Sequence, residues 1–265
     1  MKRKSHTQEH RTLAREQRWL LEEKYGGATG VAFLSDCERL ERGEPIDYVV
    51  GWSEFLGCRI DLSERPLIPR PETEWWVEKT IKIFNFQFSI FKKSPLYVLD
   101  MFAGSGCIGL AVLKHIQNAH VDFADVDRSC LAQIRKNAEL NCVAPERYRA
   151  LRSDVFQAIT GRYDVIFANP PYVAEGTAGE RLAPSARDFE PHRALFAGAD
   201  GLDYIRIVLR DASRFLAPRG LLAMEFDDTQ ADEVVGLLAH SNLRGSMHPD
   251  QYGRARYLLA ATKAD

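Results

Sequence analysis

One stretch near the middle of the chain decides the fold, and it reads Tyr97-Val98-Leu99-Asp100-Met101-Phe102-Ala103-Gly104-Ser105-Gly106-Cys107-Ile108-Gly109. Its apolar first half, residues 97–102, is typical of a buried parallel strand. Its second half satisfies the spacing G-x-G-x-x-G, and a helix is expected to follow over residues 110–117. Glycines let a backbone approach a ligand closely, and the start of a helix favours negative groups. The stretch therefore predicts a nucleotide-binding turn in an open α/β sheet.

From residue 96 onward, apolar strand patterns alternate with helical patterns, which is typical of a doubly wound sheet. We expect seven strands, at residues 97–102, 121–126, 148–153, 163–168, 221–226, 243–247 and 255–260. Helices are expected between them, at residues 128–140, 202–216 and 229–239. The fold class is thus α/β, with a seven-stranded, doubly wound, Rossmann-like sheet. Residues 173–200 are polar and rich in Gly and Pro, and we interpret them as a functional loop and candidate lid.

The part of the chain before the sheet predicts helices at residues 12–24 and 32–42 and a β-hairpin over residues 48–62 that turns near Gly57. A further helix is expected from Pro71 to residue 84, and residues 85–95 receive no assignment.

These patterns divide the chain into three parts. We expect residues 1–47 to form a small helical N-terminal domain, residues 48–67 a β-hairpin linker, and residues 68–265 the domain that contains the sheet and the glycine turn. Six of the first eighteen residues are basic, namely Lys2, Arg3, Lys4, Arg11, Arg15 and Arg18. They are either a solvated surface or a patch that contacts ribosomal RNA or an acidic partner.

Composition excludes several classes of protein. The chain of 265 residues is 45% hydrophobic, and its 35 Lys and Arg nearly balance its 37 Asp and Glu, which argues against a protein that mainly coats nucleic acid. No apolar run approaches the roughly 20 residues of a membrane span, and no signal peptide is expected. The five cysteines are scattered without a C-x-x-C pair. We therefore expect a cytoplasmic protein with reduced thiols and no metal site.

Three carboxylates around the glycine turn indicate which nucleotide it binds. Asp125 ends the strand after the turn, where it can bind a ribose hydroxyl. Asp100 precedes the turn and is placed to meet an ammonium group, while Asp154 ends the third strand and can accept from an adenine amino group. The glycine turn and Asp125 alone would also fit a dinucleotide. Asp100 and Asp154, together with the NH2-binding sequence expected at residues 169–172, favour S-adenosyl-L-methionine instead, with S-adenosyl-L-homocysteine as product. The fold would then be a class I methyltransferase sheet. The expected cofactor-binding residues are Asp100, Ala103, Gly104, Gly106, Asp125, Asp154 and Asn169.

The fourth expected strand delivers the sequence Asn169-Pro170-Pro171-Tyr172 to the same edge of the sheet. The Asn169 side-chain carbonyl and the Pro170 carbonyl are two neighbouring acceptors, which suit a substrate NH2 group. Tyr172 offers a flat face for a planar amide or base. The alternative interpretation is a proline-stiffened turn after a core strand. We assign Asn169, Pro170 and Tyr172 as catalytic residues that hold a planar NH2.

With these residues assembled, the chain resembles the protein-glutamine methyltransferases that modify peptide-chain release factors, from about residue 39 to the C-terminus. The segments that carry the resemblance are residues 42–48, 51–55, 67–74 (with I-P-R-P-E-T-E), 100–109, 169–172 and 189–195 (with E-P-x-x-A-L). The helical region before Gly43 is shorter than is usual in that family, and residues 250–256 match its ending only loosely.

The resemblance implies a substrate, the Gln of a Gly-Gly-Gln loop in a release factor. It implies that residues 1–47 recognise the substrate and that residues 68–265 are the S-adenosyl-L-methionine-dependent methyltransferase domain. In that domain, Asn169, Pro170 and Tyr172 would hold the Gln amide, and the other substrate-binding residues would be Pro171, Arg70, Glu72, Thr73 and Glu190. We expect a monomer that binds neither membranes nor, stably, nucleic acid. Three alternatives stay open: glutamine methylation of a ribosomal protein, methylation of an adenine or cytosine amino group in DNA or RNA, and a non-enzymatic cofactor-binding adaptor.

Overall fold

A computed structural model describes residues 13–90, 95–177 and 182–263 of the chain. Its main feature is a seven-stranded sheet in the order β5-β4-β3-β6-β7-β9-β8. The strands are β3 (Leu96–Met101), β4 (Ala119–Asp125), β5 (Tyr148–Arg152), β6 (Tyr163–Ala168), β7 (Leu216–Glu225), β8 (Leu243–Pro249) and β9 (Ala255–Thr262). Strands β3 to β7 pair in parallel, and β9 runs antiparallel to both β7 and β8. The Rossmann-like, seven-stranded class I methyltransferase sheet is thereby confirmed.

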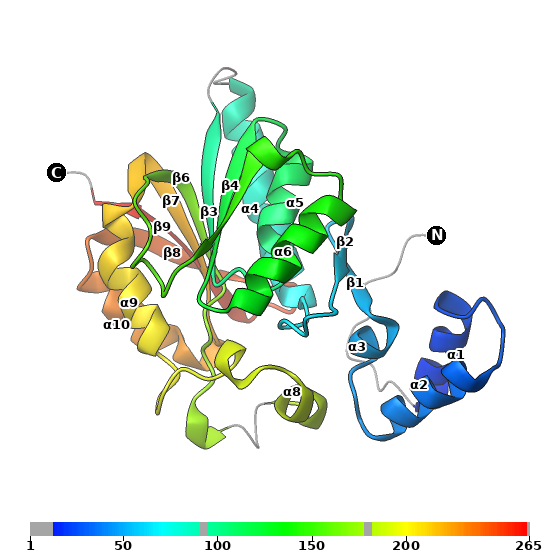
Figure 1. Cartoon of the computed structure of the whole chain (residues 1–265). Coiled ribbons are helices and arrows are strands. Elements are labelled where there is room, and N and C mark those ends of the chain that lie inside the picture. Colours follow the sequence, from blue (N-terminus) through cyan, green and yellow to red (C-terminus); the bar gives the residue numbers. More distant parts are fainter. Residues whose placement is uncertain (1–12, 91–94, 178–181, 264–265) are drawn as a thin grey trace.

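Helices cover both faces of this sheet (Figure 1). One face carries α4 (Pro71–Ile90), α5 (Cys107–His115) and α6 (Arg128–Leu140); the other carries α9 (Asp203–Asp211) and α10 (Ala231–Ala239). Successive strand side chains point to opposite faces. Val98 therefore packs in the apolar core beneath α4 to α6, while its neighbour Leu99 packs in the core beneath α9 and α10.

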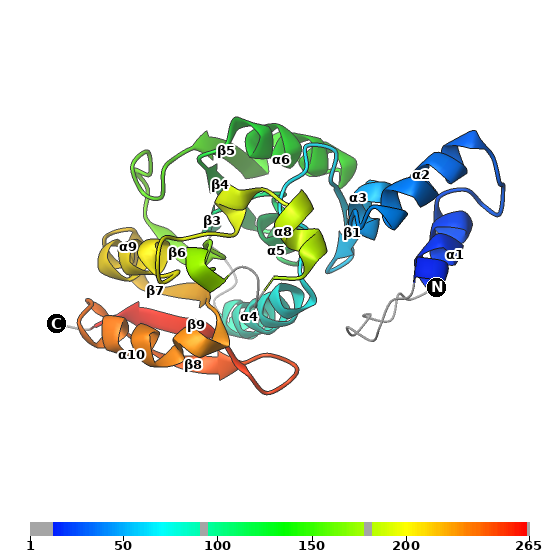
Figure 2. The same cartoon turned by 90° about the horizontal axis from the view of Figure 1, so that it is seen from below.

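The segment between β6 and β7 passes across the carboxyl ends of the strands, where α8 lies below the sheet (Figures 1 and 2). Between β6 and α9, its described residues include the short elements η2 (Glu175–Thr177), α8 (Pro184–Phe189) and η3 (His192–Ala194). The other single-turn helices are η1 (Pro145–Arg147), η4 (Ala212–Arg214) and η5 (Asp228–Gln230). The candidate lid thus has local structure of its own, outside residues 178–181, which the structure does not describe.

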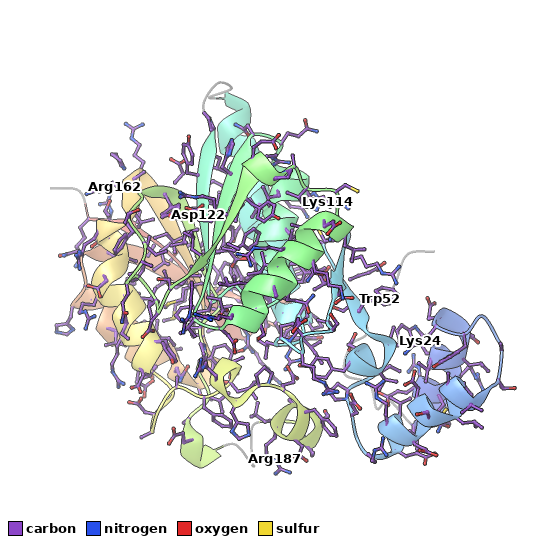
Figure 3. The ribbon with its side chains drawn as sticks, in the orientation of Figure 1. Lys24, Trp52, Lys114, Asp122, Arg162 and Arg187 are labelled. Carbon is purple, nitrogen blue, oxygen red and sulfur yellow. The ribbon has the colours of Figure 1, made fainter. Side chains whose placement is uncertain are left out.

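The N-terminal part has a separate apolar cluster. It comprises α1 (Leu13–Glu23), α2 (Val31–Glu41) and α3 (Ile46–Val50), with Leu20, Leu40 and Val49 buried between them. The hairpin of β1 (Trp52–Phe55) and β2 (Cys58–Asp61) follows, and Trp52 lies where α3 meets it (Figure 3). The hairpin is tied to α6, because Asp61 N donates to Asn137 Oδ1 at 2.8 Å. The predicted boundaries at residues 47 and 67 stay predictions.

Residues 48–50 were expected to open the hairpin, but they are the end of helix α3. Pro45 precedes this helix, and Gly51 ends it with a φ of 93°, a backbone conformation that glycine adopts without strain. The three apolar side chains Tyr48, Val49 and Val50 are all buried there. A short apolar run fits a strand and a buried helix equally well, and here the packing of Val49 and Val50 in the cluster with Leu20 and Leu40 selects the helix.

Three further boundaries differ from those expected. Helix α4 continues to Ile90, through residues that the sequence left unassigned. Helix α5 begins at Cys107, not residue 110, so Gly109 lies inside it. Helix α9 ends at Asp211, and Leu216 already pairs with Tyr163 as the start of β7.

Of the six N-terminal basic residues, Lys2, Arg3, Lys4 and Arg11 lie outside the described part. Within that part, no helix is long and apolar enough to cross a bilayer.

Candidate active site

The register of the sheet brings the predicted residues to one edge. Met101 at the end of β3 pairs with both Ala124 and Ala168, and Ala168 pairs in turn with Met224. The residues that follow these four positions therefore leave the sheet side by side. They are the glycine turn after β3, Asp125 as the last residue of β4, the Asn169 segment after β6, and Glu225 as the last residue of β7.

The glycine turn is held by Asp125, which is half-buried. Gly104 N donates to Asp125 Oδ2 at 2.9 Å, and Asp127 N donates to Asp125 Oδ1 at 2.9 Å. Gly104 and Gly106 have φ values of 54° and 79°, which side chains other than glycine rarely adopt. Burial raises the pKa of Asp125, and these backbone N–H groups oppose the shift.

Asp100 lies beneath the same turn with its carboxylate buried. Its Oδ2 accepts a hydrogen bond from Gly109 N at 2.8 Å, whereas within the described residues no group donates to its Oδ1. Burial raises the pKa of Asp100 to about 8. An acid oxygen left without a donor in the protein is suited to a cationic donor such as an ammonium group.

These residues fit S-adenosyl-L-methionine. A Cβ built on Gly104 would meet, among the described atoms, only the Phe102 carbonyl oxygen at 3.9 Å, so the turn faces open space at that point. Asp100 and Asp125 supply acceptors on either side of the turn. Asp154 follows β5 and is exposed, where it accepts from Gln157 Nε2 at 3.3 Å. Its contact with adenine stays a prediction.

Asn169 is held from the side by helix α4. Its Nδ2 donates to Thr73 Oγ1 at 3.4 Å, which leaves the side-chain carbonyl pointing away from Thr73. The two prolines behind it are buried. The backbone of Tyr172 is fixed by Gln230, whose Nε2 donates to Tyr172 O at 3.0 Å. The side-chain carbonyl oxygen of Asn169, which the sequence predicts to accept from a substrate NH2, is therefore available for that hydrogen bond.

Glu225, the last residue of β7, was not among the predicted site residues. It is buried and accepts from Thr73 Oγ1 at 2.7 Å, Trp76 Nε1 at 2.6 Å and Tyr172 Oη at 3.1 Å. Burial raises its pKa, while the Trp76 and Thr73 hydrogen bonds and the Arg256 charge act in the opposite direction. Burial and the neighbouring Glu225 carboxylate raise the pKa of Tyr172 well above the usual value of a phenol. The sequence did contain a signal for Glu225, because it is the single charged residue in the otherwise apolar run 221–226, close to the end of the expected strand.

Arg70 and Glu190, both predicted to bind the substrate, form an ion pair with each other. Arg70 Nη2 lies 2.5 Å from Glu190 Oε1, and Ile68 N donates to Glu190 Oε2 at 3.1 Å. Burial alone would lower the pKa of Arg70, but the Glu190 carboxylate raises it above its usual value. Glu72 is half-buried in the first turn of α4. Thr73, in the same turn, contacts Asn169 and Glu225.

Solved methyltransferase structures share this fold. A ribosomal protein L11 methylase from Lactobacillus delbrueckii subsp. bulgaricus matches with a TM-score of 0.53 and 16% identity, covering 77% of this chain and 84% of that one. The hMettl16 catalytic domain, solved with the MAT2A 3'UTR hairpin 6, matches with a TM-score of 0.57 and 17% identity. The match covers 89% of this chain and 81% of that one. At these identities the likeness concerns the fold alone.

Sequence relatives are more informative. Residues 86–189 match the family model described as Methyltransferase small domain. A release factor glutamine methyltransferase from Agrobacterium fabrum is 35% identical over 202 residues, which cover 76% of this chain and 68% of the relative. A protein of the same name from Cereibacter sphaeroides is 36% identical over 222 residues, covering 83% and 76%. With this identity over most of both chains, and with the fold and site above, the chain belongs to the release factor glutamine methyltransferase family.

Proposed function

We propose that this protein transfers a methyl group from S-adenosyl-L-methionine to the side-chain amide nitrogen of the Gln in the Gly-Gly-Gln motif of peptide-chain release factors. The observation that carries this proposal is the orientation of Asn169. Its NH2 is engaged by Thr73, so its carbonyl remains to accept from a substrate NH2. The relatives at up to 36% identity that bear the name release factor glutamine methyltransferase support the same substrate.

The residues around the turn would hold the cofactor. Asp100 takes the ammonium of its amino-acid part, Asp125 the ribose hydroxyls, and Asp154 the adenine amino group. The backbone of residues 103–106 lines the space between them. When bound, S-adenosyl-L-methionine supplies an electrophilic methyl group. The chain's own contribution is to place the acceptor nitrogen opposite it.

A carboxamide nitrogen is a weak nucleophile, because its lone pair is delocalised into the carbonyl. The Asn169 and Pro170 carbonyls each accept one of its two N–H groups, and Tyr172 fixes the plane of the amide and excludes water. Positioning of this kind contributes roughly 7–11 kcal/mol to a reaction. Both carbonyls also meet the positive charge that grows on the nitrogen, and removal of one such group typically costs on the order of a hundredfold. The methylated nitrogen then loses a proton to water.

Mass spectrometry of a purified release factor, incubated with this protein and S-adenosyl-L-methionine, tests the proposal. The expected result is one methyl group on the Gln of the Gly-Gly-Gln loop. A release factor with Glu in place of that Gln is the matched control and should remain unmodified. Methyl transfer to ribosomal protein or nucleic acid, with none to the release factor, would overturn the proposed substrate while leaving the cofactor assignment intact.

A further inference from the structure

We propose that Glu225 and Thr73 form a positioning relay that sets which way the Asn169 amide faces, and that the same carboxylate also fixes the ring of Tyr172. The inference rests on the proposed function, in which Asn169 must present its carbonyl to the substrate. It adds Glu225 to the site and gives Thr73 a role other than contact with the substrate.

The direction of the hydrogen bonds follows from Trp76. An indole N–H can only donate, and Trp76 Nε1 lies 2.6 Å from Glu225 Oε2. The same oxygen lies 2.7 Å from Thr73 Oγ1. Because Glu225 serves as acceptor for both, the single proton of the Thr73 hydroxyl is committed to it. Only lone pairs of Thr73 then remain for Asn169.

Asn169 must therefore meet Thr73 with its NH2 group, at the observed 3.4 Å between Nδ2 and Oγ1. The opposite orientation would place a carbonyl oxygen against the lone pairs of Thr73, which is repulsive. The side-chain carbonyl of Asn169 is thus turned away from α4, which makes it available to an incoming NH2 group. Without the relay, the two orientations of the amide would be nearly equivalent in shape.

Glu225 can act as an anchor because its surroundings are rigid and supply donors. Its Oε1 accepts from Tyr172 Oη at 3.1 Å, so three side chains donate to this carboxylate. Burial raises the pKa of Glu225, while these hydrogen bonds and the charge of Arg256 act in the opposite direction. Trp76 is fully buried between the rings of Phe167 and Tyr257, with centroid distances of 5.9 and 5.7 Å. The side chains of Asn169 and Tyr172, which we assign to bind the substrate NH2, are therefore both positioned by Glu225 at the end of β7. Tyr172 donates to Glu225 directly, and Asn169 is linked to it through Thr73.

Two substitutions at Thr73 separate the relay from simple packing. Thr73→Val keeps the shape but removes the hydroxyl, whereas Thr73→Ser keeps the hydroxyl and removes a methyl group. The relay predicts that Thr73→Val lowers kcat roughly 3- to 10-fold, the usual range for a lost neutral hydrogen bond, and that Thr73→Ser largely restores it. Affinity for S-adenosyl-L-methionine should be unchanged in both. If Thr73→Val is as active as Thr73→Ser or more so, Thr73 acts through packing and the relay is wrong.

Glu225→Gln tests the anchor. The glutamine carbonyl can still accept from Trp76 and Thr73, and its NH2 can face the oxygen of Tyr172. The Asn169 arm of the relay is then preserved, and we expect a smaller loss of kcat than in Thr73→Val. An equal or larger loss would show that the charge of Glu225, and not its hydrogen bonds, is what matters, which would overturn the relay.

The side-chain amide of Asn169 can also be followed by NMR without any substrate. Its 1H–15N signals are assigned by their loss in Asn169→Ala. We expect slow exchange with solvent in the unmodified protein and in Thr73→Ser, and loss of that protection in Thr73→Val. Equal protection in all three would refute the relay. This readout decides it even if the unmodified protein leaves release factors unmethylated, an outcome that would refute only the proposed function.

Discussion

Arg70 and Glu190 lie 120 positions apart in the chain, yet Arg70 Nη2 and Glu190 Oε1 are 2.5 Å apart. The other oxygen of Glu190 accepts from Ile68 N. Glu190 directly follows α8, and Arg70 directly precedes α4. This buried carboxylate therefore ties the segment that crosses the carboxyl edge of the sheet to the start of the helix that supports Asn169.

Replacement of Glu190 by Gln should loosen this connection. One oxygen becomes an NH2 group that must face a second donor, Arg70 or Ile68 N. Hydrogen bonds to charged groups contribute roughly 1.5–3 kcal/mol, so we expect a loss of that order in the free energy of unfolding, together with slower methylation. Chemical denaturation and an initial-rate assay measure the two effects.

A matched control for Glu190 lies on the same segment. Asp188 pairs with Arg187 at 2.8 Å on the exposed side of α8, and Figure 3 shows Arg187 at the outer surface of the molecule. Asp188→Asn should leave stability and activity unchanged, because exposed ion pairs contribute little. If the two variants behave alike, the ion pair with Arg70 is not what organises the site.

Asn169→Ala should abolish methyl transfer and spare cofactor binding. The substitution removes the side-chain carbonyl that we assign to the substrate NH2, and a loss on the order of a hundredfold or more is expected. Calorimetry should still show binding of S-adenosyl-L-homocysteine, because Asp100, Asp125 and the glycine turn are unchanged. Persistent methylation by this variant would show that another group holds the amide.

The stability of the cofactor-free protein should fall as the pH rises, because of Asp100. Burial raises its pKa from 3.8 to about 8, so the folded state binds this proton more tightly than the unfolded state does. The stabilisation that comes from protonated Asp100 is fully present below pH 3.8 and is lost as the pH rises to about 8. Asp100→Asn cannot ionise and keeps an acceptor for Gly109 N. Urea unfolding across this pH range measures the free energy of unfolding of both proteins. As the pH rises, this free energy should increase for the variant relative to the unmodified protein. A difference that stays constant with pH would contradict the prediction.

Two glycines inside helices should respond to alanine in opposite ways. A Cβ on Gly109 in α5 would lie 2.3 Å from Phe123 Cε1, so Gly109→Ala should destabilise the protein by roughly 1–3 kcal/mol. Apart from the adjacent residues and the nearby backbone of α10 itself, no described atom lies within 4 Å of a Cβ on Gly236, and Gly236→Ala should stabilise the protein by about 1 kcal/mol. Thermal unfolding of both variants decides this. A neutral Gly109→Ala would mean that α5 can move away from β4.

Some elements were predictable from sequence because their signals are local. Helix α6 begins and ends where expected, since Asp127 caps it by accepting from Ser129 N. Strand β6 also matches its predicted bounds, because an apolar run before two prolines leaves little choice. The strand predicted at residues 48–50 was wrong for the opposite reason, because its signal is not decided locally. The apolar pattern of these residues fits two structures, and the burial of Val49 and Val50 in the apolar cluster of α1 and α2 selects the helix.

The sequence by itself determined the glycine turn, the strand that carries Asn169, and the carboxylates Asp100 and Asp125, because each lies within a short motif whose chemistry is local. Only the tertiary structure decided which groups surround Asn169. Thr73 of α4 accepts from Asn169 and donates in turn to Glu225 of β7, and Thr73 and Glu225 are 152 positions apart. Their contact depends on the order of the strands and on how α4 packs across the sheet. No local pattern specifies that geometry, since it results from burying the apolar faces of distant elements together.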